Sequence, residues 1–196
     1  RERWFQAIFT TLLSNRVSSQ DIDLRKLERT LAHDELFAQL PFKPRASLRK
    51  GVHLLLDRSE SMQPFLRDEI DLFTRLQRLL GEALVQHTWF EYDPLRPVES
   101  RLTWLTPKPK QFREETPVLL VTDFGASADP LTARYMECEP WLPVLQLAHS
   151  SRCRIFALIA ASPGSWPMVL SQLVDGALLW DRETSPQAAV RLCRNS

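Results

Sequence analysis

The chain of 196 residues carries a formal charge of +1 and is 44% hydrophobic, values typical of one globular domain of ordinary size. Its 25 basic and 24 acidic residues nearly cancel, so bulk charge does not favour binding to nucleic acid or to an anionic membrane. The five glycines are too far apart to form GxGxxG or GxxxxGK, which excludes the common glycine-rich phosphate-binding loops.

The cysteines and the hydropathy pattern bear on the cellular compartment. Three cysteines make an odd number without a CxxC pair, which favours neither a disulfide framework nor structural zinc. No apolar run approaches the roughly 18 residues that a membrane-spanning helix needs, and the chain starts without a signal-peptide pattern. We therefore expect a cytoplasmic segment of a longer protein that does not bind membranes.

Two helices are predicted in the N-terminal part of the chain. Apolar residues at spacing four predict an amphipathic helix over residues 3–15. Residues 16–24 are polar and typical of turns. A second helical pattern runs from residue 23 to residue 40 and stops at Pro41, because proline removes a backbone donor and disfavours helix in the residue before it.

A basic segment broken by proline follows over residues 41–50, and we interpret it as a connector. It lies between the helical patterns and a long stretch of regularly alternating apolar runs. The predicted organisation is therefore a helical extension with its connector, residues 1–45, and a main domain, residues 46–196.

Apolar runs and helical patterns alternate in the main domain. The predicted strands span residues 52–56, 84–92, 102–105, 118–122, 154–160 and 177–180. The predicted helices span residues 64–80, 131–148, 167–173 and 186–193. The second and third strands are close enough in sequence for an antiparallel pair, whereas helical crossovers join the others. This order predicts an α/β three-layer sandwich: a mostly parallel central sheet with one antiparallel edge strand, and helices on both faces.

The first helix of the main domain has clear signals at both ends. Pro64 suits a first helical turn, and Gly81 stands where a capping glycine is expected. Its spacing predicts that one set of apolar residues faces the core: Leu66, Ile70, Phe73, Leu76 and Leu80.

Two of the apolar strands end in an aspartate, and ligands of open α/β sheets bind beyond the carboxyl ends of the strands. Asp57, Ser59 and Ser61 form an Asp-x-Ser-x-Ser loop after the first strand, and Asp123 follows the strand over residues 118–122. Carboxylate and hydroxyl oxygens suit Mg²⁺ or Mn²⁺, which prefer oxygen ligands and keep some of their water. The sequence therefore predicts a divalent-cation site with one position free for a partner's carboxylate.

The Asp-x-Ser-x-Ser loop, followed much later by Leu119-Leu-Val-Thr-Asp-Phe-Gly125, resembles the metal-ion-dependent adhesion site of the von Willebrand factor A (vWA) family. The likeness in element order covers about residues 50–181. It implies a Rossmann-type fold, a non-enzymatic role in protein binding, and metal contacts from Asp57, Ser59, Ser61 and Asp123. The family adds a threonine from another loop, for which Thr106 and Thr116 are the positional candidates.

The sequence around the first motif is similar to that of a particular group of bacterial vWA domains. It reads Leu55-Leu-Asp-Arg-Ser-Glu-Ser-Met-Gln-Pro-Phe65. These domains are encoded with MoxR-type AAA+ ATPases or embedded in multidomain conflict and defence proteins. The similarity implies an interaction module inside such an assembly. Its partner would be a protein that presents an acidic residue, a MoxR-type ATPase, or another domain of the same chain.

Other interpretations of the same residues stay open. Asp57, Ser59 and Ser61 would also serve as caps for exposed backbone donors. The chain would then be a structural adaptor with a degenerate metal site, docking through its N-terminal helix or through Trp104 or Trp166.

An enzymatic alternative, a metal-dependent phosphohydrolase or nuclease, would need further carboxylates near the same edge. Glu60 and Asp129 are the nearest in sequence, and Glu60 with Arg58 is more typical of a solvated ion pair. No GxSxG elbow and no cysteine beside a histidine is present, so the sequence predicts no catalytic residue.

Overall fold

The computed structural model describes residues 2–33, 40–91, 112–125, 141–166 and 170–180. Its contacts divide the chain into two units, residues 1–13 with 49–196 and residues 14–48. The sequence pattern placed the first helix in an N-terminal extension, whereas its contacts place it with the main unit. In the part of the chain that is described, no helix combines the length and the apolar character that crossing a membrane requires.

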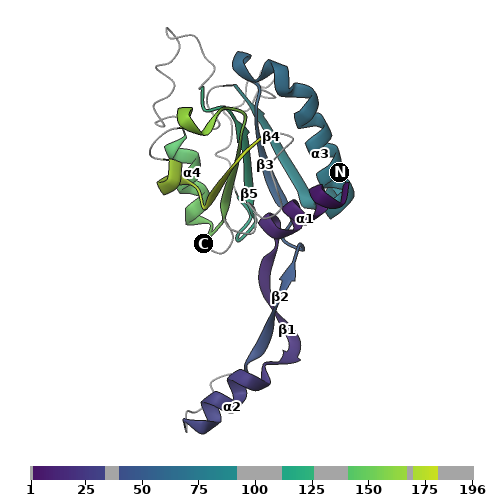
Figure 1. Ribbon diagram of the computed structural model, residues 1–196, viewed down its shortest axis with the longest axis vertical. Helices are drawn as coiled ribbons and strands as arrows, with labels where there is room; N and C mark the ends of the chain where they lie inside the picture. Colours follow the sequence, from purple (N-terminus) through teal and green to yellow (C-terminus); the bar gives the residue numbers. More distant parts are fainter. Residues whose placement is uncertain (1, 34–39, 92–111, 126–140, 167–169, 181–196) are drawn as a thin grey trace, which may run out of the picture. The chain divides into compact units, whose positions relative to one another are not determined.

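A five-stranded parallel sheet forms the centre of the main unit, in the order β4-β3-β5-β6-β7. Its strands are β3 Val52–Asp57, β4 Val85–Phe90, β5 Val118–Thr122, β6 Ile155–Ile159 and β7 Gly176–Leu179. Helices α3 Leu66–Leu80 and α4 Leu142–Ser150 cover opposite faces (Figure 1). The predicted α/β three-layer architecture is therefore confirmed. The strand and helix expected over residues 102–105 and 186–193 lie outside the described residues.

Shorter elements connect these layers. They are the 3-10 turns Glu60–Phe65, Glu82–Leu84 and Pro163–Ser165 and the four-residue helix α5 Leu170–Leu173. The predicted helix over residues 131–148 is seen only from Leu142 onward, since residues 126–140 are not described.

The strand order places a topological switch point between β3 and β5. From β3 the chain adds β4 on one side, and it then returns to add β5 on the other. In doubly wound sheets the two crossovers leave a crevice at such a point, outside the carboxyl ends of the strands. Asp57 ends β3, and Asp123 directly follows β5. Both predicted aspartates therefore lie at the switch point.

Helix α1, Glu2–Leu13, is amphipathic as its spacing predicted, and it packs in the main unit. Its buried residues are Phe5, Ile8, Phe9, Leu12 and Leu13. Arg75 of α3 lies over the Phe5 ring, 5.5 Å from its centroid, and 3.8 Å from the Glu2 carboxylate. The helix is therefore held beside α3 both by apolar burial and by an ion pair.

Helix α3 is rotated relative to the sequence prediction. Gly81 caps it as expected: its φ is 92°, and its N–H donates to the carbonyl of Gln77 at 2.8 Å. The buried side chains, however, are Glu69, Leu72 and Leu76. Ile70, predicted to face the core, is 53% exposed. A row at spacing three and four faces the sheet, and its first member is a carboxylate that hydropathy alone assigns to solvent.

The second unit is built on a strand pair that the sequence analysis missed. β1 Asn15–Ile22 pairs in antiparallel fashion with β2 Phe42–Ser47, and α2 Leu24–Ala32 lies between them in sequence. Residues 16–24 were predicted as turn and residues 41–50 as connector, and both predictions were wrong. Most residues of both strands are exposed, so no apolar alternation marks either strand.

Candidate metal centre

Asp57 is the anchor of the site at the switch point. Its carboxylate is buried, with the residue 3% exposed. Oδ1 accepts a hydrogen bond from the backbone N–H of Ser59 at 2.9 Å, and Oδ2 accepts one from the Thr122 hydroxyl at 2.6 Å. Burial raises the pKa of the Asp57 carboxyl, hydrogen bonds from Thr122 and Ser59 oppose that rise, and the nearby charge of Asp123 adds to it. A cation placed there would favour the ionised carboxylate.

The two serines connect this carboxylate to Asp123. The Ser59 and Ser61 hydroxyl oxygens lie 3.1 Å apart, and the Ser61 hydroxyl donates to Asp123 Oδ1 at 3.1 Å. The four predicted ligands other than the threonine are thus brought together from two loops. Ser59 and Asp123 are buried, whereas Ser61 is only partly buried. The accessible side of the cluster is therefore at Ser61.

The donor set fits a small, hard divalent cation. Mg²⁺ binds oxygen ligands at about 2.0–2.1 Å in an octahedron, so neighbouring ligand oxygens stand about 3 Å apart. The Ser59–Ser61 and Ser61–Asp123 oxygen pairs, each 3.1 Å apart, are hydrogen-bonded, and oxygens at this spacing would also fit as neighbouring ligands in one octahedral shell. Among the described residues, no group of three or more His, Cys, Asp and Glu side chains is placed to hold a metal. A cation here would therefore rely on hydroxyls and water beside two carboxylates.

Thr122 is a site residue that the sequence analysis did not identify. Its hydroxyl donates to Asp57 and accepts from the backbone N–H of Phe124 at 2.9 Å. Gly125 donates its N–H to Asp123 Oδ1 at 2.8 Å, and Phe124 and Gly125 have φ of 54° and 74°. The tight turn after β5 therefore fixes both aspartates. The position of Thr122 next to Asp123, at the end of a predicted strand, was the only sequence signal that Thr122 belongs to the site.

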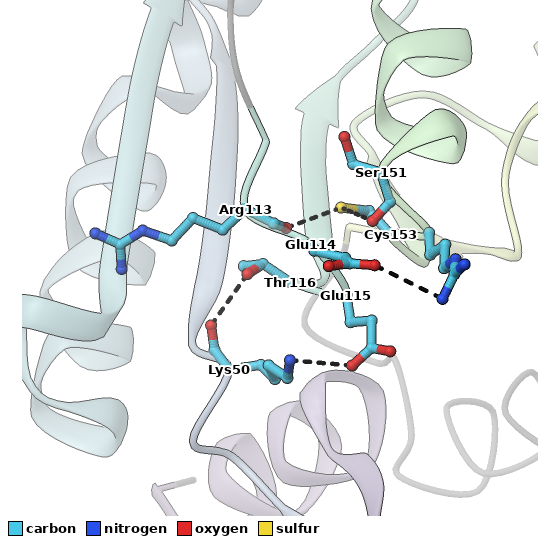
Figure 2. Close-up of polar contacts among 8 residues, drawn as sticks. Lys50, Arg113, Glu114, Glu115, Thr116, Ser151 and Cys153 are labelled. Atoms are coloured by element: carbon cyan, nitrogen blue, oxygen red, sulfur yellow. Dashed lines mark hydrogen bonds and ion pairs between the residues drawn. The ribbon is translucent and has the colours of Figure 1, made fainter.

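The threonine that the family resemblance implies is not found at the site in the described structure. Thr106 lies outside the described residues. Thr116 lies at the opposite, amino end of the sheet, where its hydroxyl donates to the carbonyl of Lys50 at 3.3 Å (Figure 2). Of the carboxylates weighed for an enzyme, Glu60 is exposed and Asp129 is not described. Trp104 is also outside the described residues.

Arg58 lies in the Asp57–Ser61 loop but does not pair with Glu60 in the structure. Its guanidinium carbon stands 3.6 Å from the centroid of the Trp89 ring on β4, and its backbone N–H donates to Phe90. Its Nε is buried without a hydrogen-bond partner among the described residues. Stacking on Trp89 therefore holds this cation beside the site, and the expected solvated pair with Glu60 is not what the structure shows.

Glu69 is the second residue that the sequence analysis missed. It is fully buried on the sheet-facing row of α3. Burial raises its pKa to about 8, with a further rise from Asp57 and an opposing effect from Arg58. No sequence pattern signals it, because a glutamate in a first helical turn is ordinarily a surface residue.

Trp166, weighed above as an interface anchor, has a structural role. Its indole N–H donates to the carbonyl of Ala161 at 2.8 Å, and its ring packs against the core beneath α4.

Comparison of the sequence with protein-family models gives no match, and comparison with curated proteins gives none either.

Proposed function

We propose that this chain is a non-enzymatic, vWA-like interaction module that binds a protein partner through a divalent cation, Mg²⁺ or Mn²⁺. Asp57, Ser59, Ser61 and Asp123 would hold the cation. The observation that supports this most is the convergence, at the switch point, of two carboxylates and two serine hydroxyls from two loops, which are the oxygen ligands that Mg²⁺ prefers. A bound cation supplies a positive charge at a position where the protein offers few ligands.

Different residues of the chain would orient the carboxylates of such a site and leave one side of it accessible. Thr122 and the backbone N–H groups of Ser59 and Gly125 orient the two carboxylates. Ser59 lies buried on the inner side of the cluster, and Ser61 lies at its accessible side. A carboxylate from a partner would approach past Ser61, so an acidic side chain is the chemistry that this site recognises best.

The cellular setting of the proposal rests on the sequence resemblance. The module would work in the cytoplasm, as part of a bacterial multidomain or multisubunit system of the conflict type. Its partner would be a MoxR-type AAA+ ATPase or another domain of the same protein. The near-balance of charge over the chain supports a protein partner rather than a nucleic acid.

A structural adaptor with a degenerate site is the second candidate. It is favoured by the internal hydrogen bonds that Asp57 and Asp123 already receive from the chain. Such bonds would satisfy both carboxylates in part without a metal. A phosphohydrolase is less well supported, since the described residues bring no third carboxylate into a metal-binding group.

The test is binding of the purified chain to the MoxR-type ATPase of the same organism, measured by biolayer interferometry with Mg²⁺ and then with EDTA. The proposal predicts that EDTA and the variant Ser61→Ala each weaken binding at least tenfold. Thr74→Ala, which alters a hydroxyl on the outer part of α3, is the control and should bind normally. Equal binding with and without EDTA would favour the adaptor.

A further inference from the structure

Glu69 is a carboxyl-bearing residue buried on the face of α3 that packs against the sheet. It begins the row Glu69, Leu72 and Leu76, whose side chains are buried against the sheet. The 3-10 turn Glu60–Phe65 joins the loop after β3 to α3, and the charge of Asp57 acts on Glu69, so the first turn of α3 lies near the edge at which β3 ends. Because the helix then runs back along the sheet, Glu69 is the member of the row nearest to that edge.

The surroundings of Glu69 in the described part of the chain offer its carboxyl group no hydrogen bond. The residue is 0% exposed, and neither carboxylate oxygen has a hydrogen-bond partner among the described residues. Asp57 and Arg58 are the charged groups that act on it, one repelling the carboxylate and one attracting it. Buried polar groups in native proteins are nearly always paired, and exceptions concentrate at functional sites.

We infer that Glu69 is an outer ligand of the cation site, accepting hydrogen bonds from water molecules that the cation holds beside Asp57. This inference rests on the proposed function. A direct bond is not supported, because Glu69 does not form a metal-holding group with the two aspartates. Mg²⁺ keeps several waters in its shell, however, and carboxylates behind a metal's ligands commonly accept their hydrogen bonds.

The arrangement explains why a buried glutamate stands in an otherwise apolar row. The cation and its water would supply hydrogen-bond donors and a positive charge to the Glu69 carboxylate. Removing the carboxylate should therefore have opposite effects in the two states. It should weaken cation binding, and it should leave the metal-free protein at least as stable as the wild type, because the buried Glu69 carboxyl has no hydrogen-bond partner among the described residues that the substitution could remove.

The experiment measures Mn²⁺ affinity of the whole chain by electron paramagnetic resonance, following the loss of the free Mn²⁺ signal. Glu69→Gln is expected to bind 10- to 100-fold more weakly than the wild type, the usual cost of losing a ligand's supporting carboxylate. The matched control is Asp68→Asn, the neighbouring acidic residue, which is exposed and should change affinity less than twofold.

Thermal unfolding in EDTA provides the second readout. Glu69→Gln and the apolar variant Glu69→Met should both unfold at or above the wild-type temperature, so that weaker Mn²⁺ binding is not the result of misfolding. Wild-type affinity in either stable variant would overturn the inference and leave the metal site standing. Absence of Mn²⁺ binding by the wild type would overturn the metal site and this inference together.

Discussion

The Thr122 hydroxyl makes two of the hydrogen bonds that hold the site together. One hydroxyl donates to the Asp57 carboxylate and accepts from the Phe124 amide, and the residue is fully buried. Hydrogen bonds to charged groups are worth more than neutral ones, and a buried group left without its partner bears a desolvation cost. Thr122 therefore couples the two loops that carry Asp57 and Asp123.

Replacing Thr122 with Val keeps the shape of the side chain and removes this hydroxyl. We expect the free energy of unfolding to fall by about 1–3 kcal/mol, measured by urea denaturation in EDTA. Thr74→Val is the matched control, since among the described residues that hydroxyl bonds only to the carbonyl of Ile70, four residues back on the same helix. The control should stay within about 0.5 kcal/mol of the wild type. An equal loss in both variants would contradict the coupling role.

At the residue scale the sequence identified Asp57, Ser59, Ser61 and Asp123 as site residues, and the structure brings them together. These residues are recognisable because they follow apolar strands, whose ends can be located from hydropathy. Glu69 was not recognisable, since its burial depends on the rotation of α3 by a fraction of a turn. The same rotation explains why Ile70, the next residue, was predicted to face the core but is exposed.

Elements with one strongly apolar face were the easiest to predict. α1 was expected over residues 3–15 and is observed over Glu2–Leu13, because its apolar residues repeat at helical spacing. β1 and β2 have mostly exposed residues on both faces, and their pairing depends on backbone hydrogen bonds that no side-chain pattern records. Sequence periodicity therefore finds the elements that pack on the core and misses those that do not.

The packing of α1 on the main unit makes a stability prediction at this scale. Leu12 is fully buried, whereas Leu24 of α2 is 59% exposed. Leu12→Ala should lower the free energy of unfolding by about 2–5 kcal/mol, and Leu24→Ala should change it by less than about 0.5 kcal/mol. Urea unfolding followed by circular dichroism measures both. A Leu12→Ala variant as stable as Leu24→Ala would show that α1 is not part of the core.

For the whole molecule, the order of the strands in the sheet determines where the candidate site lies. The sequence predicted a mostly parallel sheet covered on both faces, but not that β3 would lie between β4 and β5. That order depends on contacts between segments far apart in the chain, which hydropathy does not encode. It brings the ends of β3 and β5 side by side, and the two loops that carry the oxygen ligands meet for that reason.

The central claim is that this junction holds a divalent cation. Isothermal titration of the whole chain with Mg²⁺ and Mn²⁺ tests it most directly, with Asp57→Asn as the loss-of-site variant. The control is Glu60→Gln, an exposed acidic residue of the same loop. We predict saturable binding by the wild type and by Glu60→Gln, weakened at least tenfold in Asp57→Asn. Absence of binding by the wild type, or equal binding by Asp57→Asn, would contradict the proposed site.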